Sequence, residues 1–204
     1  MGMAEIIKPA KRLRPHNKAD VKKPVKPPRH RRRGKGHEWS ASLTQTISMP
    51  LVADLLRDVV PPMSPDEGAM LESGVLAFRR EHNGEPLVLL ISKRRSKKWG
   101  IPKGRAEPHL SLHENAAKEA FEEAGVLGYI APSSVGMFRA EKATANPLRK
   151  QVIEVWVYLL EVTETLPDWP EKEKRTIRWV TCEVAAQQLR EPVLAHLCHR
   201  LAQS

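Results

Sequence analysis

Short hydrophobic segments alternate with polar turns along the second half of the chain. Residues 73–80 (SGVLAFRR) and 86–93 (PLVLLISK) are rich in strand-forming residues, and EHNGE lies between them. Its Asn-Gly pair favours a tight turn, so these segments predict a β-hairpin. Similar patterns predict further strands at about residues 127–131, 134–141, 151–162 and 175–181.

A helical pattern occupies residues 112–124. Ser111 and Glu114 before and within it have the spacing of a capping box, and Gly125 provides the C-terminal stop. Residues 182–190 and 192–202 have helical patterns as well. Strands interleaved with a few helices indicate an α/β fold with a mixed β-sheet.

The first 68 residues differ from the rest of the chain. Residues 1–36 contain 13 of the 34 Lys and Arg residues, five prolines and only two acidic residues, which predicts a disordered basic arm over residues 1–40. Such an arm fits binding to nucleic acid or another polyanion, and it equally fits a solvated tail. Residues 41–68 predict a short amphipathic helix, MPLVADLLRDVV, followed by a proline-rich linker.

Composition restricts the compartment and the kind of stabilisation. Cys182 and Cys198 make neither a disulfide framework nor a zinc-site spacing, which fits a reducing cytoplasm. No apolar run reaches the roughly 18 residues of a membrane span, and the N-terminus lacks the apolar segment of a signal peptide. We therefore expect one domain over residues 69–204, located in the cytoplasm and without a membrane partner.

The predicted helix 112–124 concentrates negative charge on one side. At about 100° per residue, Glu119, Glu122 and Glu123 share that side, and Glu123 borders the apolar stripe. Carboxylates this close repel one another unless a cation compensates them. A solvent-exposed acidic helix face with Lys118 as a local partner is the alternative to a cation-binding site. The surrounding sequence distinguishes these two interpretations.

The segment before the helix supplies that context. KRRSKKWGIPKGRAEP carries seven basic residues between Lys93 and Arg105. Lys and Arg side chains bind phosphates, and carboxylates bind the divalent ion that lies between phosphate and protein. The combination predicts a site for a metal ion and a polyphosphate. Trp99 is interpreted as a packing anchor for this loop. His109 and His113 are not expected to be metal ligands, because magnesium prefers oxygen.

Residues 104–126, GRAEPHLSLHENAAKEAFEEAGV, resemble the Nudix box, and the spacing is kept across all 23 positions. Two positions depart from it: Leu110 replaces the first glutamate, and Lys118 replaces the arginine. Those two side chains commonly form an ion pair in the family, so slower or more selective catalysis is expected. Residues 94–108 and 157–180 are similar to the diphosphoinositol polyphosphate phosphohydrolase and dinucleoside polyphosphate hydrolase branch.

The resemblance implies a Nudix-like α/β/α sandwich and the hydrolysis of a diphosphate bond with Mg²⁺ or Mn²⁺ as cofactor. It implies catalytic and metal-binding roles for Glu119, Glu122 and Glu123, with backbone ligands from Lys103 or Gly104. Glu122 is either a ligand or the general base. The residues expected to bind the substrate phosphates are Arg94, Lys98, Lys103, Gly104 and Arg105, with Lys174 and Arg175 as weaker candidates.

Three functions remain open at this point. The first is a hydrolase acting on a polyphosphorylated small molecule, either a dinucleoside polyphosphate or a diphosphoinositol polyphosphate. The second is a non-catalytic Nudix module that senses phosphate while the arm binds RNA. The third is an enzyme that removes diphosphate from RNA 5′ ends, recruited by the arm.

Overall fold

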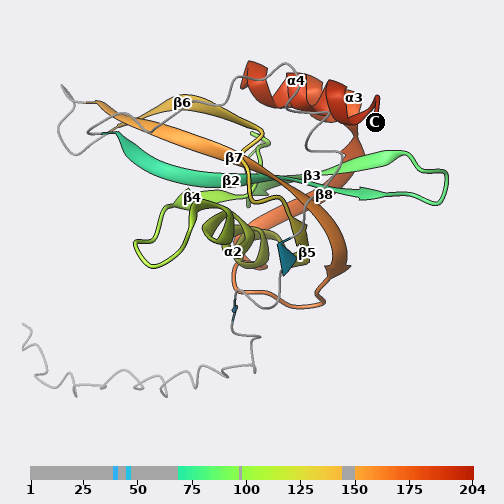
Figure 1. Ribbon diagram of the computed structural model, residues 1–204, viewed down its shortest axis with the longest axis horizontal. Helices are drawn as coiled ribbons and strands as arrows, with labels where there is room; N and C mark the ends of the chain where they lie inside the picture. The colour runs from blue at the N-terminus through green and yellow to red at the C-terminus, as the bar shows by residue number, and fades with distance from the viewer. Residues whose placement is uncertain (1–38, 41–44, 47–68, 97, 144–149) are drawn as a thin grey trace, which may run out of the picture. The chain divides into compact units, whose positions relative to one another are not determined.

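A computed structural model describes residues 39–40, 45–46, 69–96, 98–143 and 150–204. Within these residues lie eight strands and three helices (Figure 1). The strands are β1 (Gln45–Thr46), β2 (Met70–Arg80), β3 (Pro86–Lys93), β4 (Lys103–Arg105), β5 (Val126–Ile130), β6 (Gly136–Ala143), β7 (Lys150–Thr165) and β8 (Arg175–Thr181). The helices are α2 (Leu112–Ala124), α3 (Cys182–Gln188) and α4 (Pro192–Leu201).

The strands form one mixed sheet. Its order is β1-β5-β7-β2-β3-β8, with β4 paired to β2 and β6 paired to β7. The central strands β2 and β7 run parallel, whereas β2 and β3 form the predicted antiparallel hairpin. The mixed α/β architecture predicted from the sequence is confirmed.

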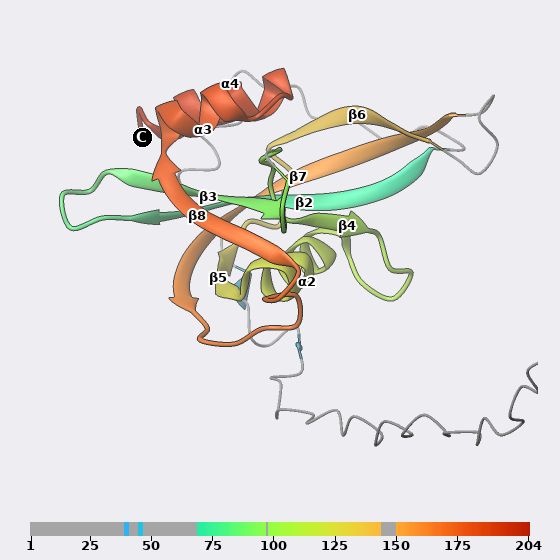
Figure 2. The ribbon, with the colours of Figure 1, turned by 180° about the vertical axis from the view of Figure 1, so that it is seen from behind.

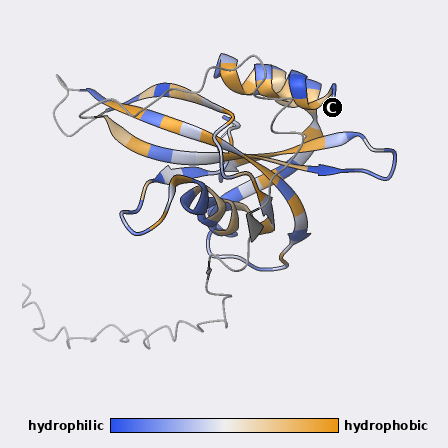
Figure 3. Ribbon diagram, in the orientation of Figure 1, coloured by the Kyte–Doolittle hydropathy of each residue, from blue (hydrophilic) through white to orange (hydrophobic). Residues whose placement is uncertain are grey.

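Helices cover both faces of this sheet, which gives the expected three layers. Figures 1 and 2 show α2 on one face and α3 with α4 on the other. Each face has its own hydrophobic core: Ala116, Ala120 and Ala124 of α2 pack in one, and Leu194 and Leu197 of α4 pack in the other. Figure 3 shows the hydrophobic residues running through the strands between these layers. Two helical layers thus bury the central strands on both sides.

Both cysteines lie in the core beneath α3 and α4. Cys182 and Cys198 are buried and unpaired, and burial raises the pKa of their thiols to about 11 and about 12. The absence of a disulfide between them agrees with the sequence-based expectation. None of the described helices is long and apolar enough to cross a membrane.

Two short strands were not predicted from the sequence. β4 lies in the basic segment before α2, and β1 lies within residues 41–68, where only a helix and a linker were expected. The helix predicted within MPLVADLLRDVV lies outside the described residues, as do residues 1–38 of the basic arm predicted over residues 1–40. The other elements have the predicted type, and their ends differ from the predicted ones by a few residues.

Candidate active site

The helix α2 begins and ends as its sequence predicts. Ser111 and Glu114 form a reciprocal capping box, and Gly125 adopts a left-handed conformation with a φ of 66°. The side chain of Trp169 packs where a Cβ atom of Gly125 would lie, so only glycine fits here. These local interactions fix the length of α2 and hence the positions of its glutamates.

The buried side chain of Asn115 connects α2 to the rest of the site. Its amide group donates a hydrogen bond to Oγ of Ser73 (2.9 Å), and its oxygen accepts one from the backbone N–H of Glu107 (3.1 Å). A buried amide with its hydrogen bonds satisfied holds its neighbours in a defined arrangement. Asn115 therefore ties the loop after β4 to both α2 and β2.

The strand β4 brings the basic segment against the glutamates of α2. The backbone N–H of Lys103 donates to Oε2 of Glu123 (3.1 Å). The next residue, Gly104, lies so close to Glu119 that a Cβ atom at this position would overlap the Glu119 carboxylate. The family motif predicts this meeting of the loop with the helix, and the geometry shows which atoms meet.

The three glutamates have different neighbours. Glu123 is buried and accepts a hydrogen bond from the guanidinium group of Arg175, which also contacts Glu171 at 2.8 Å. Glu122 contacts the ammonium group of Lys118 at 2.8 Å. No hydrogen bond or ion pair to a described residue reaches the Glu119 carboxylate. Glu119 is thus the member of the cluster whose negative charge lacks a direct partner in the described part of the chain.

The electrostatics of the cluster agree with this difference. Burial raises the pKa of Glu119 to about 7, and the nearby carboxylates of Glu123 and Glu122 add to the increase. Burial also raises the pKa of Glu123, against the opposing effects of the Lys103 N–H and of Arg175. Both shifts show that negative charge is costly here without an additional cation.

A divalent metal ion fits this donor set chemically. Carboxylate oxygens and backbone carbonyls are the ligands that magnesium prefers, and a cation beside Glu119 would relieve the repulsion that raises its pKa. In the described residues, no three acidic, His or Cys side chains are gathered closely enough to enclose an ion. Glu122 and Glu123 instead contact the cations Lys118 and Arg175.

Lys118 has a second partner that the family motif does not predict. Its ammonium group lies 3.0 Å from a carboxylate oxygen of Glu107 and 2.8 Å from one of Glu122. Leu110 cannot serve as an ionic partner, so Glu107 supplies a carboxylate from the same loop. The supporting ion pair of the motif is therefore replaced by a different pair rather than lost.

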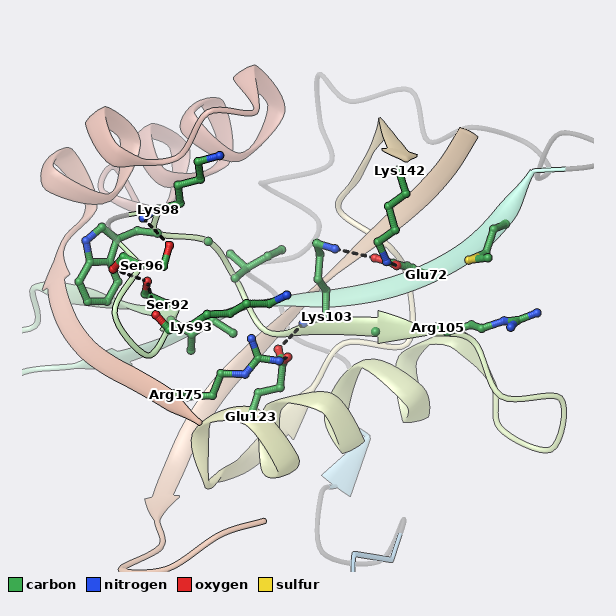
Figure 4. Close-up of a pocket in the computed structure, with 16 residues that line it drawn as sticks. Glu72, Ser92, Lys93, Ser96, Lys98, Lys103, Arg105, Glu123, Lys142 and Arg175 are labelled. Carbon is green, nitrogen blue, oxygen red and sulfur yellow. Dashed lines mark hydrogen bonds and ion pairs between the residues drawn. The ribbon is translucent and has the colours of Figure 1, made fainter. Parts of the chain in front are cut away.

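A cleft of about 560 Å³ opens beside β4, and we call it the basic cleft. Figure 4 shows side chains from β2, β3, β4, β6 and β8 that line it. Its charged lining residues are Glu72, Lys93, Lys98, Lys103, Arg105, Glu123, Lys142 and Arg175. Six of these are cations and two are carboxylates, so the cleft has the charge of a phosphate-binding site.

A second hollow lies on the α2 side of β4, and we call it the helix-side hollow. It is lined by Arg105, Ala106, Glu107, Pro108, Lys118, Glu119 and Glu122. Glu123 lines the basic cleft, while Glu119 and Glu122 line this hollow. Arg105 of β4 lines both spaces, and the other charged groups of the two spaces differ.

The predicted phosphate-binding residues fall into two groups. Lys98, Lys103, Gly104, Arg105 and Arg175 line the basic cleft. Arg94 and Lys174 lie outside its described lining, and each is paired with a nearby glutamate: Arg94 contacts Glu173 at 3.0 Å, and Lys174 contacts Glu171 at 2.9 Å.

Sequence reasoning assigned no role to three charged residues of the cleft, Glu72, Lys93 and Lys142. Glu72 precedes a hydrophobic strand, and Lys142 follows the predicted strand 134–141, so neither had a local pattern to identify it. Burial would raise the pKa of Glu72, but hydrogen bonds from Lys103 and Lys142 lower it below its ordinary value. Trp99 packs against the core and stacks on Arg178 (4.0 Å), which agrees with its expected role as an anchor.

The family model for the NUDIX domain matches residues 70–201. This chain belongs to the Nudix family. Members of the family are hydrolases that cleave phosphoanhydride bonds, so the predicted enzyme class is confirmed at that level. Nudix hydrolases generally use divalent metal ions, which agrees with the donor set around Glu119.

Two curated relatives and one solved structure show what this chain is similar to. Nudix hydrolase 12, mitochondrial, from Arabidopsis thaliana is 35% identical over 105 residues, which cover 50% of this chain and 52% of that protein. Diphosphoinositol polyphosphate phosphohydrolase 2 from Rattus norvegicus is 35% identical over 139 residues, covering 66% and 72%. A C. elegans Ap4A hydrolase structure is similar with a TM-score of 0.44 and 15% identity, covering 66% and 96%. The predicted resemblance to diphosphoinositol polyphosphate phosphohydrolases is confirmed.

Proposed function

We propose that this Nudix protein hydrolyses a phosphoanhydride bond in a small molecule that carries several phosphates. Diphosphoinositol polyphosphates and dinucleoside polyphosphates are the two candidate substrate classes. The proposal rests mainly on the contact between Lys103 and Glu123, because this hydrogen bond joins the acidic helix to a cleft with six cations. Acidic ligands beside a cationic cleft are what a metal-assisted phosphate hydrolase requires.

The metal-binding residues in this proposal are Glu119, Glu122 and Glu123, with a backbone carbonyl of Lys103 or Gly104. A bound Mg²⁺ or Mn²⁺ would neutralise phosphate charge and lower the pKa of a bound water. Glu123 is oriented by the Lys103 N–H, and Glu122 is oriented by Lys118. Fixing the direction of a carboxylate in this way favours one coordination geometry over others.

The cations of the basic cleft bind the substrate phosphates. Arg175 reaches the cleft from the start of β8, and its contact with Glu171 holds its guanidinium group toward α2. Lys98 and Lys103 approach from the loop before β4 and from β4 itself. Charge-assisted hydrogen bonds from Arg175 and Lys98 would fix the diphosphate beside the glutamates of α2, where the acid-base chemistry takes place, and Lys103 would bind a further phosphate of the same substrate.

Glu122→Gln is the decisive variant for this function. The amide keeps the size of the side chain but cannot act as an anionic ligand or accept a proton, so kcat should fall by at least about 100-fold. Product release should be measured with a diphosphoinositol polyphosphate, a dinucleoside polyphosphate and 5′-triphosphorylated RNA, each with Mg²⁺ and with Mn²⁺.

Glu164→Gln is the matched control, because Glu164 is an exposed glutamate on β7 outside both hollows. It should retain wild-type activity. Turnover that survives Glu122→Gln unchanged would contradict the proposed role, and a wild-type protein that releases no product from any of these substrates would contradict the function.

The same substrate panel separates the remaining functions. An RNA 5′-end hydrolase would prefer the RNA substrate, and that preference would decrease when residues 1–40 are removed. A non-catalytic module would bind phosphates without product release. The pairing of Lys118 with Glu107 favours catalysis, since it provides support that Leu110 cannot give. We propose a cytoplasmic location on the basis of the two unpaired cysteines.

A further inference from the structure

Glu72 is a buried carboxylate at the floor of the basic cleft, and two lysines contact it. Its side chain is only 2% exposed. The ammonium group of Lys103 lies 2.5 Å from Oε2 of Glu72, and that of Lys142 donates a hydrogen bond to Oε1. Figure 4 shows Lys103 reaching Glu72 from β4 and Lys142 reaching it from β6. One carboxylate thus holds two ammonium groups next to each other.

This cluster faces the opposite side of the sheet from the glutamates of α2. Ser73 points toward α2, because it binds Asn115, and side chains alternate along a strand. Its neighbour Glu72 therefore points to the face covered by α3 and α4, which agrees with its pairing to Val155 of the core on that face. Glu72 and Glu123 line the same cleft from different elements, β2 and α2.

The charge of the cluster exceeds what Glu72 needs. One lysine would suffice to neutralise a buried carboxylate, whereas the second leaves one net positive charge at the cleft surface. The Lys142 side chain is 58% exposed, so it remains accessible from the cleft while it contacts Glu72. Two ammonium groups held side by side can donate to different oxygens of one phosphate group.

We propose that Glu72, Lys103 and Lys142 form an anchoring subsite for a phosphate group other than the diphosphate that is cleaved. This inference rests on the proposed function and specifies its substrate: a molecule whose phosphates occupy both the Glu72 and the Glu123 ends of the cleft. Glu72 acts as a positioning residue, because it holds the lysines without touching the substrate. The subsite selects clustered phosphates over a single terminal diphosphate.

The test compares Lys142→Ala with two variants in the full-length protein. Lys142→Arg keeps the positive charge. Lys150→Ala is the control, because it removes a lysine from β7, the strand paired with β6. Lys150 contacts Glu141 and lies outside the described lining of the cleft. Binding of inositol hexakisphosphate and of ADP should be measured calorimetrically without metal, over a range of salt concentrations. Inositol hexakisphosphate carries phosphates around a ring, whereas ADP carries a single diphosphate.

We expect Lys142→Ala to weaken inositol hexakisphosphate binding about 5- to 20-fold, as for the loss of a charge-assisted hydrogen bond, and to change ADP binding less than about twofold. The salt dependence of inositol hexakisphosphate binding should also decrease. Lys142→Arg should retain most of the affinity, and Lys150→Ala should match the wild type. Equal effects of Lys142→Ala and Lys150→Ala would overturn the subsite, as would equal losses for both ligands.

These outcomes are independent of catalysis. A protein that binds inositol hexakisphosphate through Lys142 but releases no product from any substrate would keep the subsite and contradict the hydrolase. A protein that hydrolyses its substrates but shows the same inositol hexakisphosphate affinity in all three variants would keep the hydrolase and contradict the subsite. The circular dichroism spectrum of each variant should match the wild type, which excludes misfolding as the cause of a lost affinity.

Discussion

The helix-side hollow and the basic cleft share Arg105 of β4, and they are built in different ways. The hollow takes its charged groups from one continuous stretch, residues 105–122. The cleft takes its groups from β2, β3, β4, β6, β8, α2 and the loop before β4. The proposed metal ligands, Glu123 of the cleft included, all lie within residues 103–123, whereas the cations that would choose the substrate are brought together by the fold.

Gly104→Ala should break this arrangement most severely. The added methyl group would overlap the Glu119 carboxylate and push it or β4 away. We expect kcat/KM to fall by about 100-fold or more, because a displacement of about 1 Å at a reacting centre has effects of this size. Mn²⁺ binding, measured by electron paramagnetic resonance, should weaken in parallel.

Gly84→Ala is the control for a general glycine effect. Gly84 has a φ of 83° in the β2–β3 turn, outside the lining of the cleft and the hollow, so alanine should lower stability by about 1–2 kcal/mol without changing Mn²⁺ binding. If Gly104→Ala lowered only the stability and left Mn²⁺ affinity intact, the proposed closeness of β4 to a metal-binding carboxylate would be wrong.

Arg175→Gln tests the place where the two regions meet. Arg175 contacts Glu123 of α2 and also lines the cleft, so its loss should affect both. We expect KM to rise about tenfold through the loss of a charge-assisted phosphate contact, with a smaller decrease in kcat. Steady-state kinetics separate the two parameters, and Arg175→Lys should give an intermediate KM. A decrease in kcat alone would show that Arg175 orients Glu123 without binding phosphate.

Lys118→Ala should have a smaller effect on activity than Gly104→Ala and Arg175→Gln. Lys118 lines the helix-side hollow and not the basic cleft. Lys118 holds Glu107 and Glu122, and a lost orienting contact of this kind lowers activity by about tenfold. Lys118→Arg should retain activity. Glu107→Gln should reduce kcat in the same direction, and the double variant should lose less than the two single variants predict by addition. Full additivity would show that the two side chains act separately.

Elements determined by interactions between residues close in sequence could be predicted, whereas elements determined by pairing with distant residues could not. α2 was predicted with its observed ends because Ser111, Glu114 and Gly125 act within one helical turn of those ends. β4 was missed because its three residues become a strand only by pairing with β2, about 30 residues earlier in the chain. A strand of this length has no pattern of its own.

The same argument explains the site. Glu119, Glu122 and Glu123 could be singled out because they share one side of a helix within a family motif, and their metal-binding role stays a prediction. Glu72 and Lys142 are 70 residues apart, and nothing in either local sequence indicates that they meet. The roles predicted for Arg94 and Lys174 stay predictions: their side chains lie outside the described lining of the cleft and contact Glu173 and Glu171.

The alternation of side chains in β4 has a consequence for how this protein can evolve. Lys103 directs its ammonium group to Glu72, and the following residue, Gly104, faces Glu119. Deleting one residue before this strand would shift its register, so that the glycine faced Glu72 and a bulky side chain met Glu119. Substitutions in the preceding loop leave this arrangement intact. An insertion or deletion that shifts β4 by an odd number of residues would turn the side chains that face Glu72 toward Glu119, and those that face Glu119 toward Glu72.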